Sequence, residues 1–162
     1  WDLPIEEWLF FFTIPYACVF TYESLNFLIK TDSLSKYSKN ISSSLGVILI
    51  IVVLFNTGKL YTAIKLTLTV FMLAYVLIEN FSFMGKFYRA YLVCLIPFFV
   101  VNGLLTWIPV VTYNDQENLG IRIGTIPIED TVYMLLLLLM NVCLYEYFKQ
   151  LLSKDVKPKS KY

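Results

Sequence analysis

The chain has 162 residues, of which 58% are hydrophobic, 17% aromatic and only 15% charged. In a typical soluble domain about a quarter of the residues are charged, so this composition predicts a membrane protein. The sequence has no histidine, which excludes a Ser-His-Asp or Cys-His nucleophile and any histidine-ligated zinc or haem. The net charge of +1 is too small to predict a nucleic-acid partner.

Five long apolar runs predict an all-α fold, a polytopic bundle of transmembrane helices. A helix needs about 20 residues to cross the hydrocarbon of a bilayer, and the third, fourth and fifth runs reach that length securely. The second run crosses only if its polar start, residues 41–44, is included. The predicted spans are residues 8–29, 41–55, 60–78, 90–111 and 126–147.

Lysine and arginine are distributed unevenly between the two sides of such a bundle. With five crossings, one side receives ten of these residues and the other receives three. Short cytoplasmic loops hold an excess of them, which predicts a multi-pass protein of the cell membrane with a cytoplasmic C-terminus. Residues 153–162 form a basic cytoplasmic tail that can contact anionic lipid. Lys65, near the start of the third span, is expected to extend outward to the interface.

Two segments of the chain align without gaps. Residues 3–28 align with residues 126–151, at an offset of 123, and share PIE followed by an acid and, later, the pair YE. An even number of crossings separates the copies, so the predicted halves run parallel. Residues 1–30 then end the first half, 31–58 form a linker with a connecting helix, and 59–152 form the second half. We expect about two further helices before Trp1, which gives seven in all.

The acids of this repeat, Glu6 and Glu7 in one copy and Glu129 and Asp130 in the other, are the candidate catalytic residues. One interpretation is structural, because proline and carboxylates suit the first turn of a helix. The other is functional, because carboxyls beside an apolar run are costly to bury and are seldom kept without use. Neighbouring residues on a helix point about 100° apart, so one acid of each pair can face the bundle while the other faces the headgroups.

Other polar and aromatic residues have secondary interpretations. Glu23 and Glu146 lie about 25 Å along the helix from the PIE acids and are predicted to be paired or to snorkel at the cytoplasmic border. Asn102 can bond a neighbouring helix or shape a pocket. Aromatic residues near the interface can anchor the protein or stabilise a cation. The candidate substrate-binding residues are Trp8, Asn102, Trp107 and Tyr133.

The three cysteines and the glycines predict no cofactor site. Cys18, Cys94 and Cys143 all lie in apolar runs without a CxxC pair, so they indicate buried small residues and no metal site. Gly120 and Gly124 do not form a dinucleotide fingerprint, and the sequence has no Walker motif.

A family resemblance adds to these observations. The duplicated PIE motif, the strings RAYLVCLIPFFVVNGLLTW and YNDQENLGIRIG, and the helix PYACVFTYESLNF together resemble the membrane-integral lycopene cyclases of the CarR and CrtYc/CrtYd type. In that family, two homologous halves occur as separate subunits or fused. The resemblance covers nearly the whole chain. It implies an isomerase of carotenoid biosynthesis, whose acidic motif falls on Glu6, Glu7, Glu129 and Asp130, and which closes the ψ ends of lycopene into β rings without net redox change.

This chemistry needs a carboxyl that protonates the terminal double bond, attack by an internal double bond, and a base that removes a ring proton. A carboxyl at an apolar rim favours its neutral form, and aromatic faces stabilise a cation. The expected partners are lycopene or related carotenoids and membrane lipid. The alternatives are a carotenoid- or retinal-binding seven-helix protein and a small transporter. A retinal Schiff base needs a lysine in the membrane, and the last span offers none before Lys149.

Overall fold

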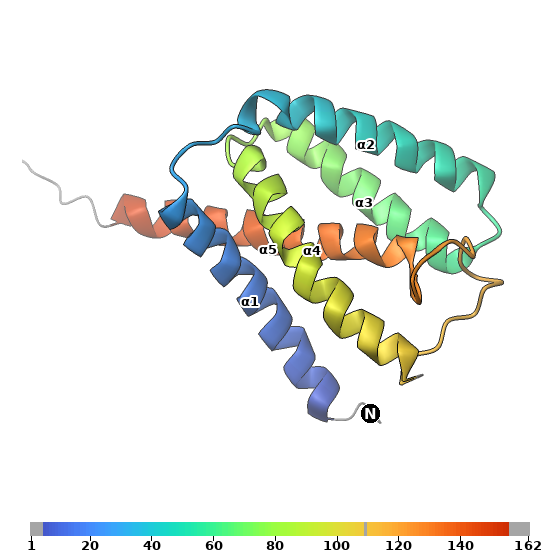
Figure 1. The fold of residues 1–162 in the computed structure, drawn as a ribbon. Coiled ribbons are helices and arrows are strands. Elements are labelled where there is room, and N and C mark those ends of the chain that lie inside the picture. Colours follow the sequence, from blue (N-terminus) through green and yellow to red (C-terminus); the bar gives the residue numbers. More distant parts are fainter. Residues whose placement is uncertain (1–4, 109, 156–162) are drawn as a thin grey trace, which may run out of the picture.

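The computed structural model describes residues 5–108 and 110–155, without the side chains of residues 6, 7, 10, 11, 154 and 155. These ranges hold five helices and one two-stranded hairpin (Figure 1), which confirms the predicted all-α bundle. The helices are α1 Ile5–Leu28, α2 Ser35–Phe55, α3 Leu60–Glu79, α4 Met84–Trp107 and α5 Ile128–Asp155. The hairpin pairs β1 Arg122–Ile123 antiparallel with β2 Ile126–Pro127, just before α5.

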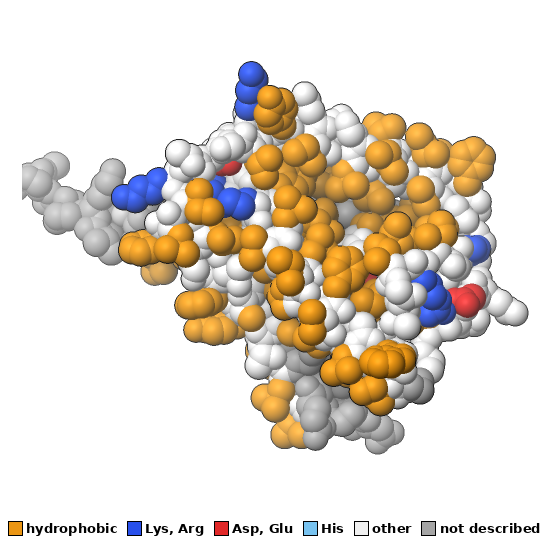
Figure 2. Space-filling model, in the orientation of Figure 1, with side chains coloured by type: hydrophobic (Ala, Val, Ile, Leu, Met, Phe, Trp, Pro, Cys, Tyr) orange, Lys and Arg blue, Asp and Glu red, His pale blue; other side chains and the backbone are white. Residues whose placement is uncertain are grey.

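Within the described residues, four helices are long and apolar enough to cross a membrane, namely α2, α3, α4 and α5. The chain is therefore a multi-pass membrane protein. Hydrophobic side chains cover much of the face in Figure 2, with the few charged side chains toward its edges. An apolar surface of this kind suits lipid, and the helices satisfy their own backbone hydrogen bonds.

Helix α2 is longer than its predicted span. It begins at Ser35, six residues before the predicted start at Ile41, because its serines find partners inside the protein. Ser38 donates to the Ser35 carbonyl, and Ser42 donates to that of Ser38. The Ser42 hydroxyl also bonds the Tyr88 hydroxyl at 2.6 Å. Serines that bond a carbonyl one turn back do not interrupt a helix, so α2 has 21 residues.

Helix α3 packs between α2 and α5 and fixes the position of the site described below. Its buried residues recur every three or four positions, as one face of a helix requires. That face is formed by Thr62, Leu66, Thr69, Leu73 and Val76. Leu138, Leu139 and Val142 of α5 are buried in the same hydrophobic core. The packing of α3 on α5 therefore sets the start of α3 against the start of α5.

Polar contacts tie the helix ends together at opposite ends of the bundle. Arg89 of α4 donates to the carbonyls of Leu25, Ile29 and Thr31, so it caps the end of α1. At the other end, the backbone N–H of Thr62 donates to the Glu117 carbonyl, which ties the loop after α4 to the start of α3.

The YE pairs of the two aligned segments meet across α1 and α5. Tyr22 donates to Glu146 Oε1 at 2.7 Å, and Lys149 Nζ lies 2.6 Å from Glu23 Oε1. The rings of Tyr22 and Tyr145 meet edge to face, with centroids 6.4 Å apart. Both glutamates are thus paired, one of the two outcomes expected from the sequence. The internal repeat itself stays a prediction.

We predict that Gly85→Ala destabilises the protein. An added Cβ would lie 2.2 Å from Asp32 Oδ1 and 2.5 Å from the backbone nitrogen of Ser35, and the latter cannot move away cheaply. Overpacking of this kind costs about 1–3 kcal/mol. The measurement is the thermal unfolding midpoint of the purified protein in detergent. Gly46→Ala is the control, because nothing lies within 4 Å of its added Cβ; equal midpoints for the two variants would contradict the prediction.

Candidate functional site

The first turn of α5 carries the second acidic pair. The hairpin delivers the chain to this turn through the bond from Ile128 N–H to the Ile121 carbonyl, and the Thr131 hydroxyl donates to the Ile128 carbonyl at 2.7 Å. Glu129 and Asp130 both lie in the first turn, as predicted, where carboxylates interact favourably with the positive end of the helix dipole. Pro127 lies in β2, one residue before the helix, and not within its first turn.

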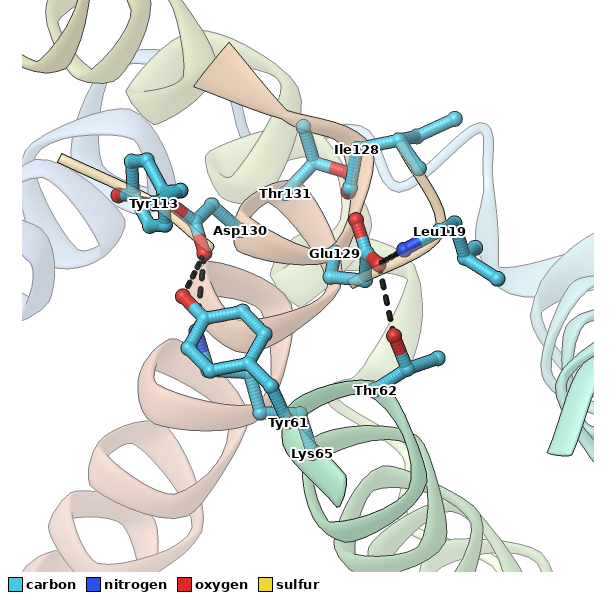
Figure 3. Close-up of polar contacts among 9 residues, drawn as sticks. All are labelled: Tyr61, Thr62, Lys65, Tyr113, Leu119, Ile128, Glu129, Asp130 and Thr131. Carbon is cyan, nitrogen blue, oxygen red and sulfur yellow. Dashed lines mark hydrogen bonds and ion pairs between the residues drawn. The ribbon is translucent and has the colours of Figure 1, made fainter. Parts of the chain in front are cut away.

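Asp130 accepts hydrogen bonds on both carboxyl oxygens (Figure 3). Tyr61 donates to Oδ1 at 2.7 Å, and Lys65 Nζ lies 2.9 Å from the same oxygen. Tyr113, from the loop after α4, donates to Oδ2. A carboxyl group that only accepts has the bonding pattern of an ionised carboxylate. The arrangement therefore leaves both oxygens of Asp130 as hydrogen-bond acceptors.

Glu129 has a different environment, beside Asp130 but turned toward α3 and the loop (Figure 3). Its Oε1 accepts from the Thr62 hydroxyl at 2.8 Å and from the Leu119 backbone N–H at 2.6 Å. Its Oε2 is buried without a hydrogen-bond partner among the residues that the structure describes. Glu129 thus joins the loop, α3 and α5.

Both acids of this pair are buried, with exposed fractions of 1% for Glu129 and 6% for Asp130. In this pair, therefore, neither acid faces the headgroups, although the spacing on the helix would allow one to do so. The physical reason is the loop after α4, because Tyr113 covers one carboxyl and Leu119 bonds the other. The angular separation on the helix directs the two acids to different internal partners instead.

Lys65 also differs from its prediction, because it turns inward to Asp130 and does not extend to the interface. Its Nζ lies 3.5 Å from the centroid of the Tyr61 ring and 4.8 Å from that of Tyr133. Aromatic faces and a carboxylate together offset the loss of water around an ammonium group. A lysine inside an apolar run is itself a signal of a site, and this signal was available in the sequence.

A cavity of about 300 Å³ opens beside Asp130. Tyr61, Lys65, Tyr113 and Asp130 form its polar end, and most of the remaining wall is apolar. The wall comes from α1, α3, α4 and α5. The other lining residues are Ile14, Ala17, Cys18, Thr21, Cys94, Pro97, Phe98, Val101, Asn102, Tyr133, Met134 and Leu137.

The structure brings together only some of the residues predicted from the sequence. Asn102 and Tyr133 line the cavity with Asp130, whereas Glu129 is not one of the lining residues. Trp8 and Trp107 lie outside this lining, with exposed fractions of 47% and 76%. The side chains of Glu6 and Glu7 lie outside the described part of the chain, although both residues belong to α1.

The loop after α4 holds Tyr113 in place through its own polar contacts. Arg122 donates to Asp115, and this bond lowers the pKa of the Asp115 carboxyl below its ordinary value. The buried Asn118 side chain accepts from the Gly120 N–H at 2.7 Å. Burial, together with the bond to Asp130, raises the pKa of the Tyr113 phenol. Tyr113 therefore stays a neutral donor at ordinary pH.

The fold and the site define a multi-pass membrane protein with a hydrogen-bonded carboxylate at the end of an apolar cavity. The family model for lycopene cyclase matches residues 1–25 and 58–148, which include both acidic pairs. The chain belongs to the lycopene cyclase family, as its sequence resemblance implied. Comparisons with curated proteins and with solved structures gave no significant match. Family membership implies a cyclase that acts on a carotenoid.

We predict that Thr62→Val destabilises the protein by about 1–3 kcal/mol, because it removes a hydrogen-bond donor from the buried Glu129 carboxyl. The unfolding midpoint in detergent measures this effect. Thr69→Val is the matched control, since Thr69 is equally buried but bonds only the Lys65 carbonyl of its own helix. An equal loss of stability in both variants would show that Glu129 does not depend on Thr62.

Proposed function

We propose that this protein is a lycopene β-cyclase, which closes the ψ ends of lycopene into β rings without net redox change. The observation that carries the proposal is Asp130, an accepting carboxylate at the end of an apolar cavity within the family-matched segment. A cavity of about 300 Å³ suits one end group of a long polyene. The rest of the substrate stays among apolar side chains and lipid.

In the proposed reaction, a carboxylic acid donates its proton to the terminal double bond and leaves a tertiary carbocation. The internal double bond attacks that cation, which forms the ring bond and moves the charge to a ring carbon. Asp130 then takes a ring proton, and the electrons of the broken C–H bond form the ring double bond. One proton enters and one leaves, so no redox cofactor takes part in the balance.

The acidic residues have different roles in this proposal. Asp130 is the base, because its oxygens accept from three side chains and face the cavity. Glu129 is a positioning residue that holds the loop and α3. Glu6 and Glu7 are the candidate proton donors, because they belong to α1, and α1 lines the same cavity with Ile14 and Cys18.

Aromatic side chains around Asp130 suit a cationic intermediate. The rings of Tyr61, Tyr113 and Tyr133 all line the cavity, and the rings of Tyr61 and Tyr113 meet edge to face with centroids 6.1 Å apart. Aromatic faces and a nearby carboxylate stabilise positive charge where water is excluded. We assign substrate contact also to Asn102, which lines the cavity, and to the exposed Trp8 and Trp107 at the lipid side.

The distribution of lysine and arginine supports a location in the cell membrane with the C-terminus in the cytoplasm. Ten of the thirteen basic residues belong to the side that carries the loops after α1 and α3 and the C-terminal tail. The Asp130 cavity then opens near the outer face of the membrane.

We predict that Asp130→Asn lowers the β-ring product by about 100-fold or more, because the amide cannot accept the ring proton. The complete reading frame is expressed in lycopene-accumulating bacteria, and the carotenoids are separated by chromatography. Glu117→Gln, which changes an exposed carboxyl in the loop after α4, serves as the control and is expected to keep full product.

Three outcomes would contradict the proposal. Full β-ring product from Asp130→Asn would show that another group removes the proton. Full product from both Glu6→Gln and Glu129→Gln would contradict the assignment of function to the paired acids. Lycopene left unchanged by the wild-type protein would contradict cyclisation altogether, as expected for a binding protein or a transporter.

A further inference from the structure

Lys65 is held in one place by three groups, which is unusual for a long and flexible side chain. Its Nζ bonds Asp130 Oδ1 at 2.9 Å and lies over the rings of Tyr61 and Tyr133. Only 18% of its side chain is exposed. Holding a lysine in one rotamer costs side-chain entropy, so the three contacts together must offset that cost.

The two oxygens of Asp130 are not equivalent. Oδ1 accepts from both Tyr61 and Lys65, whereas Oδ2 accepts from Tyr113 alone. Each carboxylate oxygen offers about two lone-pair sites. The bonds to Oδ1 therefore occupy its sites, and Oδ2 keeps one free. Because Lys65 and Tyr61 fix Oδ1, they also fix the direction in which Oδ2 points.

The position of the accepting oxygen matters for the product. After ring closure, the cation can lose a proton from three places: the ring carbon that bears the polyene, the ring methylene on the other side, or the attached methyl group. Each loss breaks a different C–H bond and leaves the double bond in a different place. Only the first loss gives a β ring. The proton nearest to the base and aligned with it is the one removed.

We propose that Lys65 is a positioning residue that determines the ring type together with Tyr61, because the two donors occupy Oδ1 of Asp130 and so direct Oδ2 at the proton on the polyene-bearing carbon. This inference rests on the proposed cyclase function and on Asp130 as its base. Lys65 does not touch the reacting atoms in this role. It acts through the carboxylate that it holds.

Substitutions of Lys65 test the proposal in the complete protein, expressed in lycopene-accumulating bacteria. Lys65→Met removes the ammonium and keeps an unbranched chain. We expect ring-bearing product to fall by about 100-fold, since a displaced catalytic group costs about that much. The remaining product is expected to contain rings whose double bond is outside the ring or shifted by one carbon. Lys65→Arg, which restores a donor to Oδ1, is expected to recover mostly β rings. Chromatography and NMR of the products measure the ring types.

Two further variants keep the test decisive. Lys36→Met is the control, because Lys36 is exposed on α2, and it should leave ring type and amount unchanged. Tyr61→Phe removes the other donor to Oδ1 but keeps the ring beneath Lys65, so it should also give mixed ring types. This variant decides the question if Lys65→Met does not accumulate in the membrane.

The outcomes separate this inference from the proposed function. β rings alone from Lys65→Met, at a membrane level equal to that of wild type, would overturn the role of Lys65 and leave the cyclase intact. If Lys65→Met does not accumulate, β rings alone from Tyr61→Phe would overturn the joint role of the two Oδ1 donors in the same way. No ring-bearing product from the wild-type protein would overturn the proposed function, and this inference with it.

Discussion

The burial of two adjacent carboxyls at the start of α5 is the constraint on which the rest of the site depends. Buried carboxyls need hydrogen-bond donors, because their transfer from water costs several kcal/mol. Apart from the loop residues Tyr113 and Leu119, those donors are Tyr61, Thr62 and Lys65, within two turns at the start of α3. The packing of α3 on α5 and the fold of the loop therefore bring the donors to Glu129 and Asp130.

The contacts of Glu129 agree with the structural interpretation of the PIED motif, and the position of Asp130 agrees with the functional one. Glu129 bonds Thr62 and the backbone of Leu119, so it connects elements that are far apart in the sequence. Asp130 faces a cavity with room for a ligand. Adjacent positions on a helix point about 100° apart, which lets one turn direct one carboxyl to the protein interior and the other to the cavity.

Composition and long apolar runs were enough to predict the helices, and the repeated PIE motif was enough to predict the acidic pair. The family followed from the resemblance of several motifs, and the family model matches over most of the chain. The sequence did not predict the fold of the loop, because its contacts depend on single side chains such as Tyr113 rather than on a repeating pattern. The sequence alone predicts that Lys65 extends outward, because a lysine near a helix end usually extends to water. Its inward turn depends on Asp130, 65 residues later in the chain. The early start of α2 depends likewise on serine contacts that apolarity does not record.

The cavity also bears on how two homologous halves could work together. Under the predicted repeat, α1 is the counterpart of α5, and Ile14 aligns with Leu137; both residues line the cavity of Asp130. The family match leaves out residues 26–57, which contain the predicted linker helix. Most of the cavity wall comes from α3, α4 and α5, in the same predicted half as Asp130, and α1 of the other half completes it. A site of this kind is incomplete in either half alone. Such a site needs only that α1 packs beside the helices of the second half. A covalent link between the halves therefore raises their effective concentration but adds no functional group to the site.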